Sequence, residues 1–340
     1  MSEIRLGVIG GGAIAQVIHL PLLKKIEGVK VTALSELDNQ RLQILGRQHG
    51  IKKLYLSFED LLKDPEIDLV DICTSSDTHF EIALAALNAG KNVLIEKPPT
   101  INYDQCETLA KTADEKGKVV LAAMNNRFRS DFMMLKSYLN DKQLGEVFYI
   151  NAAWHKKEPS TRMHIDSKPQ TRRGVMLDLG IVLIDLALWL LNFPKVNAVN
   201  AAFFSRRFKK VEDTALVTIR TKSGAMIRLD ASWGLQQPDE SFHFEIYGTS
   251  GTATLSPLVL HHRVEAADPV RGEELVSLTP VQNSKFENVF KRSYEAELAS
   301  FIRSLTGVKS DLPTISQMCH VMEIVDASYA SAKRENAVKV

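Results

Sequence analysis

The sequence predicts an α/β protein in two parts: a doubly wound parallel sheet covered by helices, followed by an α+β domain with a large, mostly antiparallel open sheet. Three observations lead to this prediction. Short apolar runs alternate with helical stretches in the first third of the chain, period-two patterns flank turn residues later, and helices close the chain. A length of 340 residues suits two domains of ~150 residues each. We expect these domains at residues 1–123 and 124–340.

The apolar runs of the first part are the expected strands of the parallel sheet. Between them, His79–Asn88 repeats apolar residues at helical spacing, and Gly90 follows as a helix stop. Strands that are apolar along their whole length are typical of a sheet with helices on both faces. The expected strands are Ile4–Ile9, Val29–Leu34, Leu69–Cys73, Asn92–Ile95 and Val119–Ala122.

The second part carries the alternation of antiparallel strands. Apolar and polar residues alternate over Val217–Trp233 around Ser223-Gly224, which is typical of a hairpin. The same alternation recurs in Phe242–Tyr247 and Thr252–Leu255. An antiparallel sheet of this kind packs one face on helices. The closing helices are expected over Tyr294–Leu305 and Ile315–Arg334.

Composition and charge exclude several classes of protein. Hydrophobic residues make up 45% and charged residues 24%, as in an average globular protein. Lys and Arg number 42 against 41 Asp and Glu, so the net charge of +1 gives no cationic excess for nucleic acid. The most apolar stretch, Gly174–Leu191, carries Asp178 and Asp185. Since carboxylates are costly at the centre of a bilayer, we expect a buried helix there.

Cysteine usage and the N-terminus bear on the compartment. The three cysteines form no C-x-x-C motif, which fits a reducing environment. The first residues lack the basic region and cleavage site of a signal peptide. We therefore expect a cytoplasmic protein without nucleic-acid or membrane partners, and no motif predicts a metal.

The turn after the first strand carries a dinucleotide-binding motif. Gly10-Gly-Gly12-Ala13-Ile14-Ala15 has the pattern G-x-G-x-x-A between a strand and a helix. Gly10 permits the tight turn, Gly12 lets the backbone approach a pyrophosphate, and Ala15 allows close packing. The helix that begins at Ala13 and Ile14 then offers N–H groups and a positive dipole to the phosphates.

An acidic residue at the end of the next strand indicates the cofactor. Glu36 lies 36 − 12 = 24 residues after Gly12, near the ~20 expected for the carboxylate that binds the adenosine ribose. A carboxylate there favours NAD, because it repels the 2′-phosphate of NADP. Arg41 is close enough in sequence to leave NADP open.

Further motifs follow the whole chain in order. Together they resemble the Gfo/Idh/MocA oxidoreductases, the family of glucose–fructose oxidoreductase and inositol dehydrogenase. The resemblance rests on the motifs as a set, since none is specific alone. The motifs are Thr74-Ser-Ser-Asp-Thr-His79, Glu96-Lys97-Pro98, Asn126-Arg127-Phe128, Gly174-Val-Met-Leu-Asp178-Leu-Gly180, Glu212-Asp213-Thr214 and Ala327-Ser-Tyr-Ala-Ser-Ala332.

The resemblance implies an architecture and an activity. It implies an N-terminal Rossmann domain that binds NAD(P), with the nicotinamide between the domains. It implies a C-terminal α/β domain for substrate binding, whose open sheet joins subunits into a homodimer or homotetramer. The implied reaction is hydride transfer between nicotinamide C4 and a hydroxyl or carbonyl carbon of a sugar, polyol or related small molecule.

The resemblance also implies roles for single residues. Lys97 matches the lysine that reaches the nicotinamide ribose and the substrate oxygen, and Pro98 packs beside the ring. Thr74, Ser75 and His79 match a loop near the inner half of the cofactor, and Glu96 belongs to the Lys97 motif. On the substrate side the match is Asp178. His19 is expected to brace the first helix near the diphosphate.

Chemistry independently supports a role for Lys97. Hydride transfer from a carbinol carbon needs a base for the hydroxyl proton, and the reverse reaction needs an acid. A partly desolvated lysine has a lowered pKa and can exchange that proton. Lys97 also follows a strand of the predicted parallel sheet, at the edge where such sheets bind ligands.

One position departs from the family pattern. Members usually carry D-x-G-x-H, whereas this chain has Val182 in place of the histidine that follows Asp178 by one turn. On a regular α-helix, Asp178, Val182 and Asp185 share one face. Valine cannot carry a proton, so the usual acid–base group is absent from this stripe. Asp185 matches a substrate-contacting position in polyol-oxidising members.

Several explanations remain open. Lys97 can act as the acid–base group itself. A residue of the basic loop after Trp154 can take over, with Arg162 and His164 also as candidate substrate contacts. The protein can instead bind the dinucleotide without turnover, as a sensor or regulator, or use a bound NAD in glycoside cleavage. The other basic residues of the loop are His155, Lys156 and Lys157.

Overall fold

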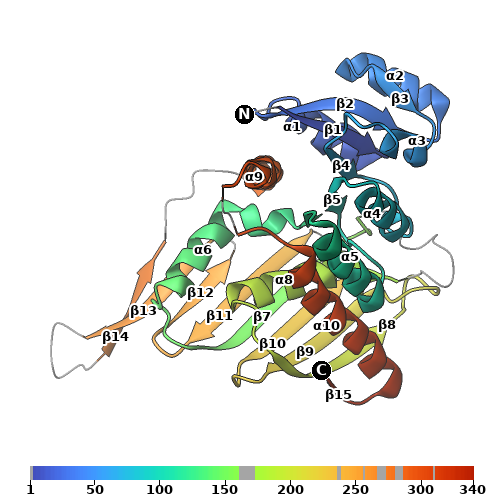
Figure 1. Cartoon of the computed structure of the whole chain (residues 1–340). Helices are drawn as coiled ribbons and strands as arrows, with labels where there is room; N and C mark the ends of the chain where they lie inside the picture. Colours follow the sequence, from blue (N-terminus) through green and yellow to red (C-terminus); the bar gives the residue numbers. More distant parts are fainter. Residues whose placement is uncertain are drawn as a thin grey trace. The chain divides into compact units, whose positions relative to one another are not determined.

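The computed structural model describes residues 3–160, 173–235, 239–255, 257–265, 273–279, 286–308 and 311–340 (Figure 1). Contacts within the chain define two compact units. Unit 1 comprises Met1–Phe128 and Phe290–Met322, and unit 2 comprises Arg129–Val289 and Glu323–Val340. The expected domains, residues 1–123 and 124–340, are each one continuous segment. In the structure, residues 290–322 belong by their contacts to the same unit as the N-terminal residues.

Unit 1 contains a parallel sheet in the order β3-β2-β1-β4-β5-β6. The strand order reverses between β1 and β4, and ligands of such sheets bind at the carboxyl ends beside that point. The predicted doubly wound sheet is confirmed, with one further strand, β3, that the sequence pattern does not predict. The strands are β1 (Ile4–Ile9), β2 (Val29–Ser35), β3 (Lys53–Tyr55), β4 (Leu69–Ile72), β5 (Asn92–Glu96) and β6 (Val120–Ala123).

Helices cover the sheet of unit 1. The predicted helix His79–Asn88 is confirmed as α4, and Gly90 follows it in the left-handed conformation with φ +74°. The helices are η1 (Ala15–His19), α1 (Leu20–Leu23), α2 (Asn39–His49), α3 (Phe58–Leu62), α4 (His79–Asn88), α5 (Tyr103–Lys116), η2 (Asn125–Phe128), α9 (Phe286–Leu305) and the first part of α10 (Ile315–Arg334).

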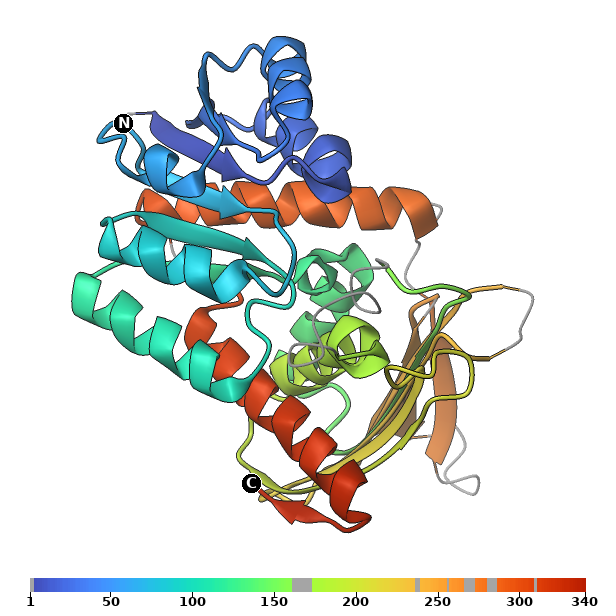
Figure 2. The ribbon, with the colours of Figure 1, turned by 90° about the vertical axis from the view of Figure 1, so that its right-hand side faces the viewer.

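Residues 290–322 join unit 1 because α9 supplies part of its core. Leu298 and Phe301 are buried in the same cluster as Leu6 and Val8 of the central strand. Figure 2 shows α9, in orange, lying along the blue strands. The parallel sheet therefore receives one of its covering helices from the far end of the sequence.

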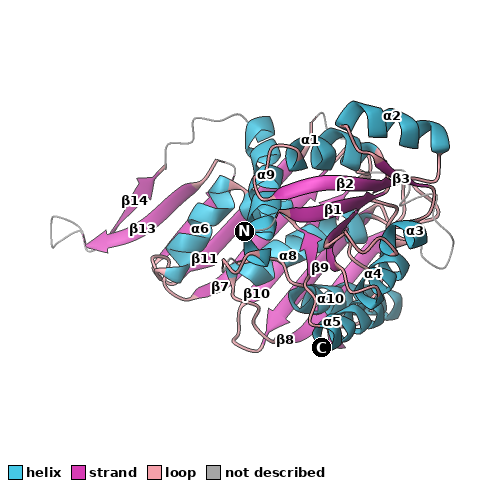
Figure 3. Cartoon of the chain, turned by 45° about the horizontal axis from the view of Figure 1, so that its top comes forward, coloured by secondary structure: helices cyan, strands magenta, loops and turns pink. Residues whose placement is uncertain are grey.

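Unit 2 contains a sheet in the order β14-β13-β12-β11-β7-β10-β9-β8-β15 (Figure 3). Among its described strands only β7 and β10 pair in parallel, so the prediction of a mostly antiparallel sheet is confirmed. The strands are β7 (Val147–His155), β8 (Val196–Phe204), β9 (Thr214–Thr221), β10 (Met226–Ser232), β11 (Ser241–Gly248), β12 (Gly251–Leu255), β13 (Val259–Glu265), β14 (Glu273–Leu278) and β15 (Val338–Lys339).

One face of this sheet packs on helices. Along β9, the buried Val217 and Ile219 alternate with the more exposed Leu216 and Arg220. The predicted hairpin is confirmed as β9 and β10, with Gly224 in the turn at φ +97°. The helices of unit 2 are α6 (Ser130–Asn140), η3 (Met176–Gly180), α8 (Ile181–Leu190) and the second part of α10.

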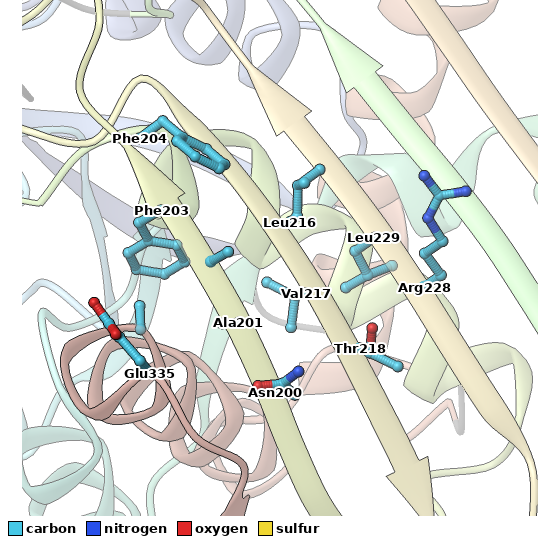
Figure 4. A pocket seen from close by; sticks show the side chains of 12 residues that line it. Asn200, Ala201, Phe203, Phe204, Leu216, Val217, Thr218, Arg228, Leu229 and Glu335 are labelled. Atoms are coloured by element: carbon cyan, nitrogen blue, oxygen red, sulfur yellow. The ribbon is translucent and has the colours of Figure 1, made fainter.

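Residues of β8, β9 and β10 line a pocket of about 480 Å³ (Figure 4). Its lining combines Phe204 and Leu216 with Thr218 and the guanidinium of Arg228. None of the predicted site residues lines it.

The helix predicted over Gly174–Leu191 is present as η3 and α8, and every residue of the two is buried. No helix in the described ranges has the length and apolar character that spanning a membrane requires.

Candidate active site

The glycine-rich turn of unit 1 fits a dinucleotide. Gly10 has φ +97°, and a Cβ there would lie 2.9 Å from the backbone carbon and oxygen of Cys73. Only glycine is therefore compatible with this turn, which approaches the end of β4. At Gly12, by contrast, a Cβ would have the Cys73 oxygen as its nearest neighbour, at 3.7 Å. The protein leaves space beside Gly12, as a site for a pyrophosphate requires.

The helix that follows the turn begins without a side-chain cap. Ala13 and Ile14 are already helical, and no described side chain caps the start of η1. Uncapped N–H groups at a helix start are suited to bind an anion. The next turn, Ala15–His19, is π-helical, which the sequence pattern does not predict.

Glu36 is fixed at the end of β2. Its Oε2 accepts a hydrogen bond of 2.8 Å from the Gly11 N–H, and its Oε1 accepts one of 3.0 Å from the Asp38 N–H. Arg41 Nη1 lies 3.3 Å from Oε2 and also pairs with Asp38 through Nη2. The carboxylate is thus held beside the glycine turn, in the place from which an acidic residue bonds a ribose.

A buried histidine joins the loops after β4 and β5. His79 Nδ1 lies 2.8 Å from the Pro98 carbonyl oxygen, and Nε2 lies 3.2 Å from that of Thr74. Burial lowers the pKa of His79, although the two carbonyls act in the opposite direction. The Thr78 hydroxyl donates to the Ser75 carbonyl in the same loop. The structure therefore brings Thr74, Ser75, His79 and Pro98 together.

Lys97 follows β5 directly, and its peptide bond to Pro98 is cis. Its N–H donates to Glu96 Oε2 at 3.0 Å, while Glu96 Oε1 lies 2.8 Å from His19 Nε2. His19 Nδ1 in turn lies 2.7 Å from Asp71 Oδ2. From the sequence we expect His19 to brace the first helix near the diphosphate, whereas in the structure both its ring nitrogens join carboxylates.

Burial and neighbouring charges shift the pKa values of His19 and Glu96 in opposite directions. Burial alone lowers the pKa of His19, but the charge of Asp71 and its hydrogen bond outweigh that effect and raise the pKa well above its usual value. For Glu96, burial raises the pKa, but the hydrogen bond from His19 and the charges of His19 and Lys97 together outweigh burial, so the net shift is downward. An imidazolium between two carboxylates is the state that these shifts favour.

Two further residues lie around His19. Cys73 is buried, and burial raises the pKa of its thiol to about 12. Glu297 of α9 is 2% exposed, and burial together with the charge of Glu96 raises its pKa well above the usual value. His19, Asp71 and Cys73 lie close enough to hold a metal ion. Since both nitrogens of His19 face carboxylates at hydrogen-bond distance, we interpret the group as a hydrogen-bonded chain.

In unit 2, Asp178 is fully buried. Its Oδ2 accepts hydrogen bonds from the Ser160 N–H at 2.9 Å and from Trp233 Nε1 at 3.2 Å. Val182 and Asp185 are also buried, on α8. The shared face predicted for these three residues assumed a regular α-helix, whereas Met176–Gly180 forms a π-helical turn. The angle of 100° per residue therefore does not hold between Asp178 and Val182.

The start of the helix that bears Asp178 is held by Glu212. Its Oε1 accepts from the N–H of Gly174 at 2.8 Å, from that of Met176 at 3.2 Å and from the Tyr329 hydroxyl at 2.5 Å. A Cβ on Gly174 would lie 2.0 Å from the Glu212 carbonyl oxygen. In the sequence, Glu212 is only one part of a motif, and Tyr329 belongs to a different motif 117 residues away.

The structure describes the start of the basic loop after β7. His155 Nε2 lies 3.2 Å from Asp230 Oδ1, and Lys156 Nζ lies 3.9 Å from Glu240 Oε1. The candidate substrate contacts Arg162 and His164 lie outside the described residues.

Comparisons with known proteins show the family of the chain. Residues 4–124 match the family model for the Gfo/Idh/MocA oxidoreductases with an NAD-binding Rossmann fold, and residues 136–340 match the model for their C-terminal α/β domain. The chain belongs to this family. It is accordingly an enzyme of the oxidoreductase class with an NAD-binding Rossmann domain.

Individual relatives share between 21% and 30% of their residues with this chain. The chain is 30% identical to scyllo-inositol 2-dehydrogenase (NADP(+)) IolW of Bacillus subtilis over 59% of this chain and 55% of that protein. It is 26% identical to D-glucoside 3-dehydrogenase of Escherichia coli over 100% of this chain and 98% of that protein. Levoglucosan dehydrogenase in complex with NADH and levoglucosan shares the fold, with a TM-score of 0.86, 21% identity and full coverage of both chains.

Proposed function

We propose that the protein is an NAD(P)-dependent dehydrogenase that interconverts a hydroxyl and a carbonyl group on a sugar, a polyol or a related small molecule. The observation that carries the proposal is the position of Lys97, directly after β5 at the carboxyl edge of a parallel sheet that also bears the glycine turn and Glu36. The substrate class is supported by the inositol and glucoside dehydrogenases among the relatives.

In this proposal Lys97 handles the proton. When bound, the nicotinamide accepts or gives the hydride at C4. In the reduction direction the Lys97 ammonium polarises the substrate carbonyl oxygen and supplies its proton, and in the oxidation direction the neutral Lys97 amine accepts the hydroxyl proton. Val182 has no group that can carry a proton. Asp178 orients the substrate, with its carboxylate fixed by Ser160 and Trp233. Asp185, Arg162 and His164 remain proposed substrate contacts.

Activity of a Lys97→Ala variant tests this role. Turnover is expected to fall by about 10²–10⁴-fold, the usual contribution of an acid–base group, while the dissociation constant for the cofactor changes little. Reduction of NAD and NADP is followed by absorbance against a panel of sugars and polyols. Lys111→Ala, an exposed lysine of the same unit, serves as the matched control. Full activity of Lys97→Ala would refute the mechanism.

We further propose that the enzyme prefers NAD, because the Glu36 carboxylate is held by the Gly11 N–H at the ribose position. Glu36→Ala is expected to weaken NAD binding by about tenfold or more, the value of a hydrogen bond to a charged group, and NADP binding less. Titration calorimetry with both cofactors measures this ratio, with the exposed Asp60→Ala as control. Equal losses for the two cofactors would contradict the preference.

Two alternatives make different predictions. A dinucleotide-dependent sensor binds the cofactor but gives no absorbance change with any substrate. A member that cleaves glycosides releases sugar from a chromogenic glycoside without net reduction of NAD. Pairing of subunits through the open face of the unit 2 sheet, as a homodimer or homotetramer, also stays a prediction.

A further inference from the structure

The buried chain Asp71–His19–Glu96 ends at the backbone of Lys97. We propose that His19 is a positioning residue for the reaction: by holding Glu96, it fixes the backbone from which the Lys97 side chain extends. This inference rests on the role proposed for Lys97. Nothing in the sequence motif of Lys97 indicates His19, which lies 77 residues from Glu96 along the chain.

The geometry leaves Glu96 with one orientation. Its two oxygens have different partners, since Oε1 faces His19 Nε2 at 2.8 Å and Oε2 accepts from the Lys97 N–H at 3.0 Å. Rotation of the carboxylate would break one of these bonds. His19 is equally constrained, because Asp71 on β4 holds its other nitrogen at 2.7 Å. The position of the Lys97 backbone is thus tied to β4 and to the helix η1.

The energetics favour a role beyond stability. Asp71 and His19 are 0% exposed, and Glu96 is 8% exposed. Charges buried in this way cost desolvation energy, and apolar residues of similar volume in their place are often as stable or more so. A chain of three such groups that ends beside the proposed catalytic lysine is therefore better explained by positioning. The ionised Glu96 also lies near the Lys97 ammonium, whose charge lowers the Glu96 pKa.

The ionisable groups around His19 are acids. In the part of the chain that the structure describes, they are Asp71, Cys73, Glu96 and Glu297. Burial and the charge of Glu96 raise the pKa of the Glu297 carboxyl well above its usual value. Among these buried groups, His19 is therefore the one that can pair with Glu96 as a cation.

Two amide variants separate the two bonds of His19. The amide nitrogen of His19→Gln reaches the position of Nε2 and can still donate to Glu96, whereas that of His19→Asn reaches the position of Nδ1 and can donate only to Asp71. Both substituted side chains are uncharged and smaller than histidine. Positioning predicts that kcat falls by about 10²-fold in His19→Asn, as expected when a catalytic group is misplaced, and much less in His19→Gln.

The measurement is kcat and KM for both variants, with cofactor affinity and the free energy of unfolding. Leu109→Ala, a core truncation on α5 of the same unit, shows what loss of stability alone does to kcat. The proposal is supported if kcat is higher in His19→Gln than in His19→Asn whatever the order of their stabilities. It is overturned if both retain wild-type kcat, or if kcat follows stability along the line set by Leu109→Ala.

A further variant, Glu96→Asp, tests the proposal if His19→Asn does not fold. Glu96→Asp keeps the charge and withdraws the carboxylate by one methylene group, so kcat is expected to fall while KM stays near wild type; unchanged kcat would overturn the proposal. Lys97→Ala distinguishes the two proposals. If Lys97→Ala is active, the proposed mechanism itself fails, whereas an inactive Lys97→Ala beside a fully active His19→Asn refutes only the positioning role.

Discussion

Each unit of the molecule holds a buried glutamate next to a proposed functional residue, but the pKa values of the two glutamates are shifted in opposite directions. Glu96 stands behind Lys97 and Glu212 behind the helix of Asp178, and each is 8% exposed. Burial acts to raise the pKa of both. For Glu96 the hydrogen bond from His19 and the charges of His19 and Lys97 together outweigh burial, so the pKa falls. For Glu212 burial outweighs its hydrogen-bond donors, so the pKa rises.

The difference lies in the donors. Glu212 accepts from two peptide N–H groups and a tyrosine hydroxyl, all neutral. Glu96 accepts from one peptide N–H, that of Lys97, but faces His19, whose pKa is raised. Cationic neighbours, His19 first and then Lys97, therefore lower the pKa of a buried carboxylate more than three neutral donors do. Glu96 of unit 1 therefore has a cationic hydrogen-bond donor, whereas the donors to Glu212 of unit 2 are neutral.

The largest effect is expected for Glu96→Gln. This change removes the anion that faces His19, and its single carbonyl oxygen cannot accept from both His19 and Lys97. The free energy of unfolding is expected to fall by about 1.5–3 kcal/mol, the value of a hydrogen bond to a charged group. Urea unfolding of the cofactor-free protein measures it. Wild-type stability of this variant would show that the two glutamates do not differ as described.

The smallest effect is expected for Glu212→Gln. All three donors bond to Oε1, and an amide oxygen in the same place can accept from them. Because the donors to Glu212 are neutral and burial raises the pKa of its carboxyl, the loss in unfolding free energy is expected to stay below about 1 kcal/mol. A loss in unfolding free energy as large as that of Glu96→Gln would contradict this difference between the two glutamates.

The raised pKa of Glu212 also gives this variant a characteristic pH dependence. A raised folded-state pKa contributes stability that is present below the unfolded value of 4.5 and is lost as the pH rises through the folded value. Wild type should therefore lose stability relative to Glu212→Gln as the pH rises above 4.5. Unfolding curves at several pH values compare the two proteins directly.

Much of the fold follows from local patterns in the sequence. The strand β1, the helix α4 and the hairpin of β9 and β10 were predicted from periodicity and turn residues, because those features act over a few neighbouring positions. The three-residue strand β3 has too few residues to show a period. The π-helical turns η1 and η3 have no composition of their own, so the angle predicted between Asp178 and Val182 failed there.

The supports of the site could not be predicted from sequence for a different reason. Asp71 lies within an apolar strand and Glu297 within an amphipathic helix, where neither residue forms part of a motif. Their significance arises only when strands and helices from distant parts of the chain are brought together around His19. Lys97 was predicted from the family resemblance and its place after a strand, and Glu36 from its spacing after Gly12 at the end of a strand; their functional roles stay predictions.

The contribution of α9 to unit 1 has a consequence for synthesis. The ribosome makes the six parallel strands first, but Leu298 and Phe301, which complete the core around Leu6 and Val8, leave it only after β7 to β14 of unit 2. Until then the emerging chain exposes an apolar surface that its own later residues are meant to cover. Such a surface is where chaperones bind and nascent chains aggregate. The N-terminal unit of this enzyme is thus the first to be synthesised and among the last to be finished.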